Sequence, residues 1–539
     1  MLLDLAGYDP CIDLGCRLAV EPAAGEGAFL LPMARRLVKS CRRYGRPLPE
    51  AAPALIAFEL HGQSARRARA SLIAALVGWA VSPAEAEGLA RAWVRTGDYL
   101  ACAPDLPPAD FVLGNPPYLR PEDVEPSRYA AYRHAYRTMV GRADVYVGFF
   151  EAALGQLKPG GVCAFLCADR WMRNQYGAEL RRMITTGYGV EAVLEMHEAR
   201  PFEDDVSAYP AITVIRRGPQ RAAVAARAAG EIAPAEAAAL AGALRAVTSP
   251  HSVPLPAGTM AARVPNWFSG SDPWPCGSPA QLALLKRLEA AFGSLESEET
   301  GTRVGIGVAT GRDDVFITTD PGLVETSRLL PLALARDTRH GTLRWSGHYL
   351  VDPWEEGGLA ALPAFPRLSD YLRRHETALR ARHVGRHSPE RWYRTIDRVT
   401  PGLRARAKLY LPDIKDRIHP VLDRGETYPH HNLYYVVSDR WDLEVLGGLL
   451  LSDVGQLFVR SYTVVMRGGY PRFQAQYLRR IRVPRPDAIP FRLAEDLREA
   501  FRQRDVGAAT RAACEAYGIP GDEAEALHGS GGTAWKLTA

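Results

Sequence analysis

The stretch LAVEPAAGEGAF, residues 18–29, indicates the fold class of this chain. A short apolar run reaches Glu21 and Pro22, and two glycines, Gly25 and Gly27, then open a segment with helical periodicity. Glycines at a strand-to-helix turn let the backbone approach a ligand closely, and the first helical turn offers free N–H groups. The stretch predicts a ligand-binding turn between a strand and a helix, although a purely structural turn would give the same pattern.

This stretch begins a longer alternation of strand-like and helical segments. Apolar strand candidates recur at 18–22, 54–60, 110–116, 162–168, 191–196 and 211–217. Helical patterns lie between them, as in 28–44 and in 145–161, and we expect Gly160-Gly161 to end the latter helix. The order predicts an α/β fold with a doubly wound, Rossmann-like sheet.

Acidic residues follow two further strands of this sheet. Glu59 lies near the end of the strand at 54–60, where a doubly wound fold commonly holds a ribose diol with a carboxylate. Asp98, in the run Thr-Gly-Asp-Tyr, follows another strand candidate. Either acid alone is more often a solvated loop residue, but their order after the glycine turn favours a bound nucleoside.

The tetrapeptide Asn115-Pro116-Pro117-Tyr118 follows an apolar strand. Two prolines remove two backbone donors and stiffen the chain, which a rigid structural turn would also use. A fixed carbonyl beside an Asn side chain places two acceptors where an amino group could bind, and the Tyr ring offers a flat face for stacking. The tetrapeptide therefore favours a planar ligand that carries an NH₂ group.

With these motifs in order, the chain resembles the N6-adenine DNA methyltransferases of restriction-modification systems. It is most similar to the γ-class, TaqI-like group, and within it to the BsuBI/PstI-type and XhoI-type modification methylases. The resemblance rests on EPAAGEGAF, FEL, TGDY, NPPY, ADVYVGFFEAAL, GGVCAFLCADRW and PFEDDVSAYPAITVI, and more loosely on GIGVATGRDDVFI (305–317) and GGYPRFQAQYLRRIRVP (468–484). It implies an S-adenosylmethionine-dependent methyltransferase fold followed by a target recognition domain.

The resemblance also implies roles for single residues. The cofactor S-adenosylmethionine would be bound by Glu21, Pro22, Gly25, Gly27, Glu59, Leu60, Asp98, Tyr99, Asn115 and Phe149, with Asp144 in the fifth motif. Asn115, Pro116, Pro117 and Tyr118 would be catalytic, and Tyr118 and Phe202 would sandwich the target base; for Phe202, a core residue opening a strand is the alternative. No metal is expected.

The second half of the chain predicts a DNA-binding surface. Three ranges divide the chain: a catalytic domain over 1–250, a connector over 251–300, and a mixed α+β recognition domain over 301–539 with a helical C-terminal end. Segment 371–418 holds thirteen Arg or Lys against five Asp or Glu, interleaved with aromatic rings. Arg467, Arg472, Arg479 and Arg480 are further candidates for contacts with duplex DNA. A solvated face in an Arg-rich protein would have the same composition.

Composition excludes a largely disordered chain, a collagen-like fibre and a small disulfide-rich protein. The 539 residues are 47% hydrophobic and 24% charged, typical of a globular protein, and no apolar run reaches membrane-spanning length. The eight cysteines form no CxxC, and we expect them to be reduced thiols in a cytoplasmic protein. Of 66 basic residues only six are Lys, a bias that a G+C-rich genome would also produce.

The sequence thus predicts a site-specific adenine-N6 methyltransferase of a restriction-modification or phage-defence system. We expect a monomer that binds double-stranded DNA and does not contact a membrane. We also expect a separately encoded restriction endonuclease that acts on the same DNA recognition sequence. The alternatives are a methyltransferase acting on protein glutamine or RNA, and a catalytically silent DNA-specificity subunit. Relatives usually carry a Thr-Pro-containing motif before the glycine turn, and only 17 residues precede Leu18 here, so we expect the true start to lie upstream.

Overall fold

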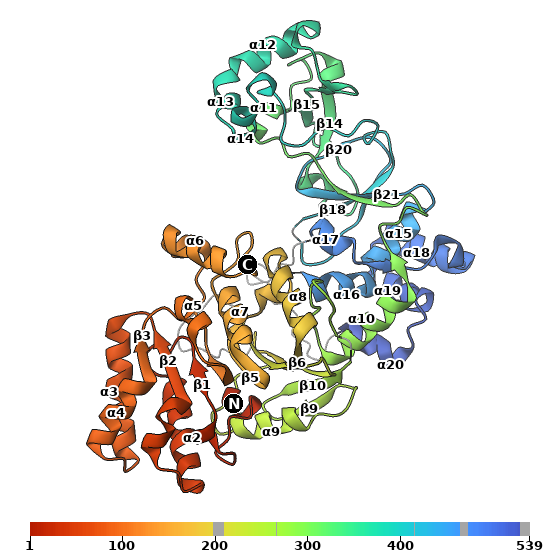
Figure 1. Ribbon diagram of the computed structural model, residues 1–539. Coiled ribbons are helices and arrows are strands. Elements are labelled where there is room, and N and C mark those ends of the chain that lie inside the picture. The colour runs from red at the N-terminus through yellow and green to blue at the C-terminus, as the bar shows by residue number, and fades with distance from the viewer. Residues whose placement is uncertain (198–209, 266, 414, 464–472, 529–539) are drawn as a thin grey trace. The chain divides into compact units, whose positions relative to one another are not determined.

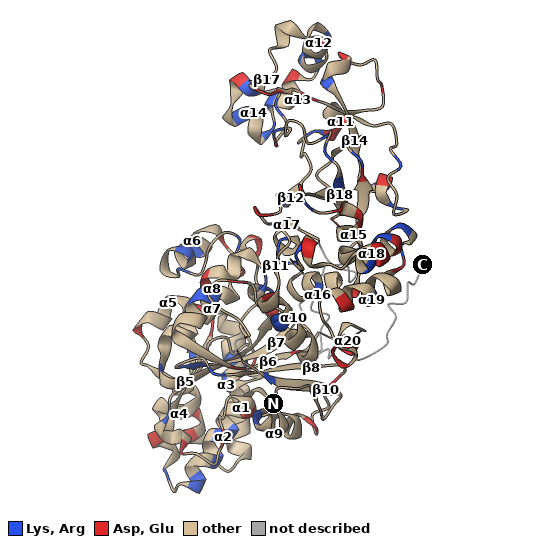
Figure 2. Cartoon of the chain, turned by 90° about the vertical axis from the view of Figure 1, so that its right-hand side faces the viewer, with Lys and Arg blue, Asp and Glu red and all other residues tan. Residues whose placement is uncertain are grey.

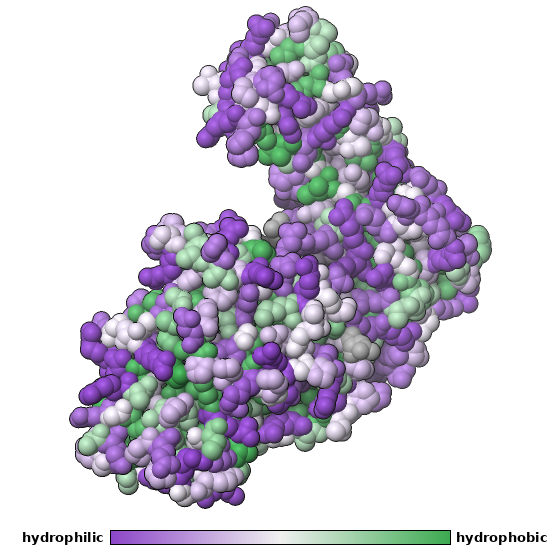
Figure 3. Space-filling model, in the orientation of Figure 1, coloured by the Kyte–Doolittle hydropathy of each residue, from purple (hydrophilic) through white to green (hydrophobic). Residues whose placement is uncertain are grey.

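The computed structural model divides the chain into two compact units, Met1–Ala283 and Leu284–Ala539. It describes all residues except 198–209, 266, 414, 464–472 and 529–539 (Figure 1). Among the described residues, no helix is long and apolar enough to cross a bilayer. On the face shown in Figure 3, hydrophilic residues cover most of each unit, and apolar residues form scattered patches.

A ten-stranded sheet forms the centre of the first unit, in the order β3-β2-β1-β4-β5-β7-β6-β8-β10-β9. Its strands are β1 Ala19–Glu21, β2 Leu55–Glu59, β3 Val94–Thr96, β4 Ala109–Gly114, β5 Leu157–Ala168, β6 Tyr188–Glu195, β7 Pro210–Arg217, β8 Ala223–Ala228, β9 Val253–Leu255 and β10 Thr259–Val264. Strands β3, β2, β1, β4 and β5 run parallel, whereas β7 is antiparallel to both of its neighbours.

Helices cover both faces of this sheet. They are α1 Leu2–Leu5, α2 Leu30–Arg43, α3 Gly62–Gly78, α4 Pro83–Trp93, α5 Tyr99–Cys102, α6 Pro126–Ala135, α7 Tyr146–Gln156, α8 Ala178–Gly187 and α9 Ala237–Ala246. Helix α10, Pro279–Ala291, contains the boundary between the units, and its residues from Leu284 onward belong to the second unit. Successive strand residues point to opposite faces, so Phe111 packs in the core with α2, α3, α4 and α9, while Val112 packs with α5 to α8. The predicted doubly wound α/β fold is confirmed.

Two parts of this sheet differ from the sequence expectation. The helix expected over 145–161 ends at Gln156, so Gly160-Gly161 as its stop was wrong; both glycines lie in β5. A Cβ on Gly161 would lie 2.9 Å from the Ala109 carbonyl oxygen, so the close pairing of β4 and β5 requires a glycine there. The start of the expected connector, 251–300, forms β9 and β10, and β8 lies beyond the last predicted strand at 211–217.

The second unit contains smaller sheets and a helical cluster. One sheet has the order β12-β21-β18-β19 and another β13-β15-β14-β20. The strands are β11 Gly293–Ser294, β12 Arg303–Ile306, β13 Ile317–Thr318, β14 Leu329–Ala333, β15 Tyr349–Val351, β16 Trp354–Glu355, β17 Gly358–Leu359, β18 Lys408–Pro412, β19 Val421–Asp423, β20 Tyr428–Pro429, β21 Leu433–Val437 and β22 Arg482–Val483.

The helices of this unit fall into two groups. The first comprises α11 Asp313–Phe316, α12 Pro366–Arg374, α13 Glu376–Arg380 and α14 His383–His387, and the second α15 Leu443–Leu451, α16 Asp453–Tyr462, α17 Ala475–Leu478, α18 Phe491–Gln503, α19 Val506–Ala516 and α20 Gly521–Ala524. Basic residues, blue in Figure 2, recur on α12 and α14, whose last turns hold Arg373, Arg374 and Arg386. The mixed α+β composition expected for 301–539 is therefore present.

Candidate active site

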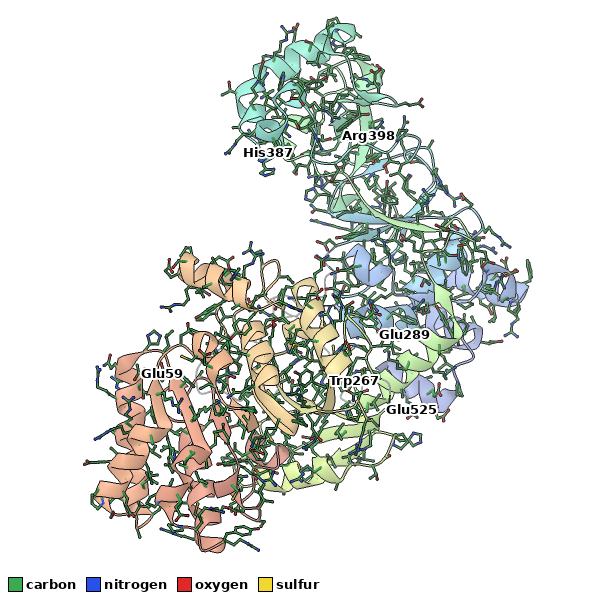
Figure 4. All side chains as sticks on the ribbon, viewed as in Figure 1. Glu59, Trp267, Glu289, His387, Arg398 and Glu525 are labelled. Carbon is green, nitrogen blue, oxygen red and sulfur yellow. The ribbon has the colours of Figure 1, made fainter. Side chains whose placement is uncertain are left out.

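Four parallel strands bring the expected site residues to one edge of the large sheet. Glu21 is the last residue of β1 and Glu59 the last residue of β2, while Asp98 and Asn115 follow β3 and β4. Parallel strands end at the same edge, and a crevice there is the usual ligand site of an open α/β sheet. Figure 4 labels Glu59 at this end of β2. The four residues therefore lie along one line of strand ends.

Glu21 is the most deeply buried ionisable residue of this edge. It is 1% exposed, and neither carboxylate oxygen has a hydrogen-bond partner among the described residues. Burial, with a contribution from the nearby negative charge of Glu59, raises the pKa of Glu21 to about 8. A buried carboxylate without donors is costly, and a ligand with a cationic or N–H group would supply the missing partner.

The glycine turn holds Glu59 in place through backbone donors. The N–H groups of Gly25 and His61 donate to the two carboxylate oxygens of Glu59 over 2.9 and 2.8 Å. Gly25 and Gly27 have φ angles of +56° and +107°, which glycine adopts without strain. A Cβ on Gly25 would meet no atom within 4 Å, so the turn is open to a ligand on that side.

Leu60, directly after β2, and Asp98, after β3, add an apolar and an acidic side chain to this edge. Leu60 is 38% exposed, one of the more exposed large apolar side chains of the described chain. Asp98 accepts a hydrogen bond from the Leu100 N–H and another, over 2.6 Å, from the hydroxyl of Tyr132 on α6. The sequence reasoning missed Tyr132, because an aromatic residue in a weakly amphipathic helix gives no signal for such a contact.

Tyr99 and Phe149, both expected at the cofactor, lie in the core below the sheet edge. Tyr99 is 1% exposed, and its hydroxyl donates to the side-chain oxygen of Gln156 over 3.0 Å. Phe149 is 6% exposed, and its ring centroid lies 5.6 Å from that of Tyr99. The Phe58 ring meets the Tyr99 ring edge-on with centroids 5.7 Å apart, so the three rings form one buried aromatic cluster.

The Asn115–Tyr118 turn lies directly beside Glu21. Gly114 has φ +154°, and a Cβ there would lie 3.5 Å from Cγ of Glu21, so the ends of β4 and β1 meet closely. The Tyr118 hydroxyl is 2.6 Å from Oδ1 of Asn115, to which it donates, and 3.1 Å from the carbonyl of Leu166. Burial raises the pKa of Tyr118, so its hydroxyl stays protonated as a donor.

Residues of the fifth motif support this turn from α7. The N–H of Val145 donates to the carbonyl of Leu119 over 2.9 Å, which joins the turn to the start of α7. Asp144 accepts from the Tyr176 hydroxyl over 3.1 Å, and burial raises its pKa. Asp144 is therefore hydrogen-bonded to Tyr176, next to the residue that joins α7 to the segment after Tyr118.

The remaining expected residues divide between described and undescribed parts. Phe202, Arg467 and Arg472 lie outside the described residues. Arg479 donates to a carboxylate oxygen of Glu296 and to the carbonyl of Val304. Arg480 stacks its guanidinium on the Tyr462 ring, 4.7 Å from the centroid. The two described arginines thus have partners within the second unit.

Three comparisons place the chain among known proteins. Residues 109–202 match the family model described as Eco57I restriction-modification methylase. The Type II methyltransferase M.PaeR7I of Pseudomonas aeruginosa is 44% identical over 98% of this chain and 92% of its own length. The Type II methyltransferase M.XhoI of Xanthomonas vasicola is 42% identical over 97% of this chain and 96% of its own length.

Among solved structures, the Type IIL restriction-modification enzyme MmeI, solved in complex with DNA, has a similar fold. The similarity covers 98% of this chain and 73% of that chain with a TM-score of 0.58, at 12% sequence identity. At that identity the likeness concerns the fold alone, and the nearly full-length relatives decide the family. The chain belongs to the Type II methyltransferases of restriction-modification systems.

Proposed function

We propose that this protein is a site-specific DNA methyltransferase that methylates the N6 amine of an adenine flipped out of duplex DNA. The observation that carries the proposal is the position of the Asn115–Tyr118 turn, which begins directly after Gly114 at the point where the end of β4 meets buried Glu21. Two rigid acceptors beside a cofactor-type carboxylate suit the transfer of a group to an amine. The membership of the Type II methyltransferases of restriction-modification systems supports DNA as the substrate.

The residues at the sheet edge fit S-adenosylmethionine as the methyl donor. Glu21, with two unpartnered oxygens, would accept from the cationic amino group of its methionine part. Glu59 would bind the ribose hydroxyls, the exposed face of Leu60 would cover the adenine ring, and Asp98 would accept from the adenine amine. When bound, this cofactor supplies a methyl group on a positively charged sulfur, which leaves as a neutral thioether.

Asn115 and Pro116 would prepare the target amine for attack. The lone pair of an adenine amine is conjugated with the ring, which makes the amine a poor nucleophile. Acceptors on both of its hydrogens favour a pyramidal nitrogen, and fixed orientation contributes most of the remaining acceleration. The Tyr118 hydroxyl orients the Asn115 amide, so that the side-chain oxygen faces one direction only.

The target adenine must leave the base stack, because its N6 is not accessible inside a duplex. Flipping costs a few kcal/mol, and stacking on the Tyr118 ring, together with Phe202, would recover part of that cost. We propose that the second unit selects the site, with Arg479 and Arg480 among its DNA contacts and Arg467 and Arg472 as further candidates. A separately encoded endonuclease would recognise the same sequence.

The proposal is tested by expressing the full chain in a host that lacks DNA methylation. Mass spectrometry of the genomic nucleosides should detect N6-methyladenine, and modification-sensitive sequencing should find it in one recurring site. Detection of N4-methylcytosine instead, or of no modified base, would contradict adenine-N6 specificity.

Asn115→Ala tests the catalytic assignment, because it removes one acceptor for the target amine. We expect methyl transfer to duplex DNA to fall by at least about a thousandfold, the effect of removing a key transition-state contact. Calorimetry should find S-adenosylmethionine affinity within about threefold of wild type, since Glu21 and Glu59 remain. Turnover close to wild type would remove Asn115 from the mechanism.

A further inference from the structure

The His430 side chain is buried in the second unit and makes no hydrogen bond of acceptable geometry. It is 5% exposed, its Nε2 faces Oδ2 of Asp313 at 3.3 Å, and its Nδ1 has no hydrogen-bond partner among the described residues. Buried polar groups are nearly always satisfied. His430 also lines an open hollow of about 490 Å³, together with Asp313, Arg336, His348 and Asn432. A buried imidazole at the wall of a hollow indicates a missing ligand.

The backbone fixes His430 and its neighbour His431 between two segments. The N–H of His430 donates to the carbonyl of Ala333, and that of His431 donates to the carbonyl of Val308, each over 3.1 Å. The two imidazole ring centroids are 4.0 Å apart, so both rings point to the same side of the chain. Nδ1 of His431 also has no hydrogen-bond partner among the described residues.

A glycine turn brings an acidic side chain to this histidine pair. A Cβ on Gly307 would lie 2.2 Å from the carbonyl oxygen of His430, so only a glycine lets segment 305–311 pass this close. The segment leads to Asp313, whose Oδ2 lies 3.3 Å from Nε2 of His430. The Thr310 hydroxyl donates to the other oxygen of Asp313 and orients the carboxylate.

The three side chains have the spacing of a metal site. One ligand atom from each of Asp313, His430 and His431 lies within 4.8 Å of the other two. Zinc bonds of roughly 2.0–2.2 Å in tetrahedral geometry place neighbouring ligand atoms about 3.3–3.6 Å apart. The ring nitrogens of His348 are within hydrogen-bond distance of Arg336 and Ser346. His348 therefore already has polar partners, and we do not include it among the metal ligands.

We propose that Asp313, His430 and His431 bind a divalent transition metal ion of the zinc type. The ion would link the turn at 305–313 to the segment between β20 and β21, and so stabilise the second unit. Its remaining coordination positions would face the hollow, because Asp313 is 49% exposed at the open side. Sequence spacing gives no signal for such a site, since adjacent histidines match no ligand motif and the acid lies over a hundred residues earlier.

The site is tested with the untagged full-length protein after dialysis against a chelator. Zn²⁺ titration should reach about one ion per chain by elemental mass spectrometry, and Co²⁺ should give the visible absorption of a nitrogen- and oxygen-bound ion. His430→Gln should abolish stoichiometric binding, and Asp313→Asn should weaken it by at least about tenfold. The thermal midpoint of wild type should rise on adding Zn²⁺, that of His430→Gln should not, and that of Asp313→Asn should rise less at the same Zn²⁺ concentration.

A second histidine pair provides the control. His383 and His387 on α14 stack with ring centroids 4.0 Å apart on an exposed helix, and Figure 4 labels His387. His383→Ala should leave the stoichiometry, the Co²⁺ spectrum and the Zn²⁺-dependent midpoint shift unchanged. Asp313 is half exposed, so Asp313→Asn should keep the wild-type circular dichroism in chelator even if His430→Gln does not. The proposal is overturned if wild type fails to bind Zn²⁺, if folded Asp313→Asn binds it normally, or if His383→Ala loses it.

Discussion

Glu21 combines deep burial with two unpartnered carboxylate oxygens at the edge where the ligand is proposed to bind. A natural protein retains such a group at a cost in stability where function requires it. The pKa of about 8 makes this cost measurable, because the protonation of Glu21 differs between the folded and unfolded chain near neutral pH.

Glu21→Gln should therefore change the pH dependence of stability. The unfolded carboxyl titrates near pH 4.5 and the folded one near pH 8, so between these values the folded protein holds a proton that the unfolded chain has lost. This contribution to stability is lost as the pH rises from about 4.5 to about 8, by up to roughly 5 kcal/mol. The stability of Glu21→Gln relative to wild type should increase over the same interval.

Thermal unfolding at several pH values without ligand measures this effect. Glu26→Gln is the matched control, because Glu26 belongs to the same turn but is 64% exposed and paired with Arg67. A constant difference between Glu21→Gln and wild type from pH 5 to pH 8 would argue against a raised pKa at Glu21.

Tyr118→Phe separates the two proposed roles of Tyr118. The variant keeps the ring for stacking but loses the hydroxyl that donates to Asn115. We expect single-turnover methylation to slow by about tenfold, the worth of one hydrogen bond of about 1–1.5 kcal/mol. Tyr118→Ala should lose considerably more, because stacking is lost as well. Equal losses in both variants would mean that the hydroxyl, and not the ring, is the essential part.

At the scale of elements, the parallel half of the sheet was predictable from sequence and the far half was not. Strands such as β4 and β5 are apolar runs buried on both faces, which gives a strong signal. The residues of β8 are mostly Ala, a residue with little intrinsic preference for strands, and pairing with β6 and β10 decides their conformation. Tertiary pairing of this kind leaves no local pattern.

The candidate site shows the same division. Strand ends could be read from sequence, and Glu21, Glu59, Asp98 and Asn115 do end or follow strands β1 to β4, which the strand order brings to one edge. The hydroxyl contact from Tyr132 to Asp98 depends on how α6 packs, and no spacing along the chain encodes that. Roles in binding and catalysis remain predictions.

Gly448→Ala tests the packing of helices α15 and α18. A Cβ on Gly448 would lie 2.4 Å from the carbonyl oxygen of Leu497, so the two helices meet at backbone distance. We expect Gly448→Ala to destabilise the second unit by about 1–3 kcal/mol, as overpacking does. Gly507→Ala in α19 is the control, since its Cβ would meet only ordinary contacts of 3.4 Å or more. Urea unfolding followed by circular dichroism distinguishes the two variants.

At the scale of the whole molecule, the chain consists of two compact units, and the second carries a cluster of basic and aromatic residues. Arginines of the basic segment 371–418 surround the ring of Trp354: the guanidinium carbons of Arg391 and Arg398 lie 5.9 and 5.8 Å from its centroid. Both side chains are exposed, and Figure 4 labels Arg398. Exposed guanidinium groups held on an aromatic ring suit contacts with a phosphate backbone.

Replacing Arg391 and Arg398 together by Gln should weaken DNA binding and its salt dependence. Each phosphate contact contributes about 0.9 to the slope of log affinity against log salt, so the slope should fall by nearly two. Fluorescence anisotropy with a duplex over a range of salt concentrations measures it. Arg492→Gln on α18, 84% exposed, should leave the slope unchanged. An unaltered slope in the double variant would place the DNA elsewhere.

The large sheet ends in two very short strands, β3 and β9, of three residues each. An unpaired sheet edge is a template on which another chain can add a strand, and long flat edges promote aggregation. Here the outer strand β9 carries Pro254, which has no N–H to donate, so a foreign strand would find few continuous partners there. The ten-stranded sheet is thereby protected against edge-to-edge growth at its β9 end.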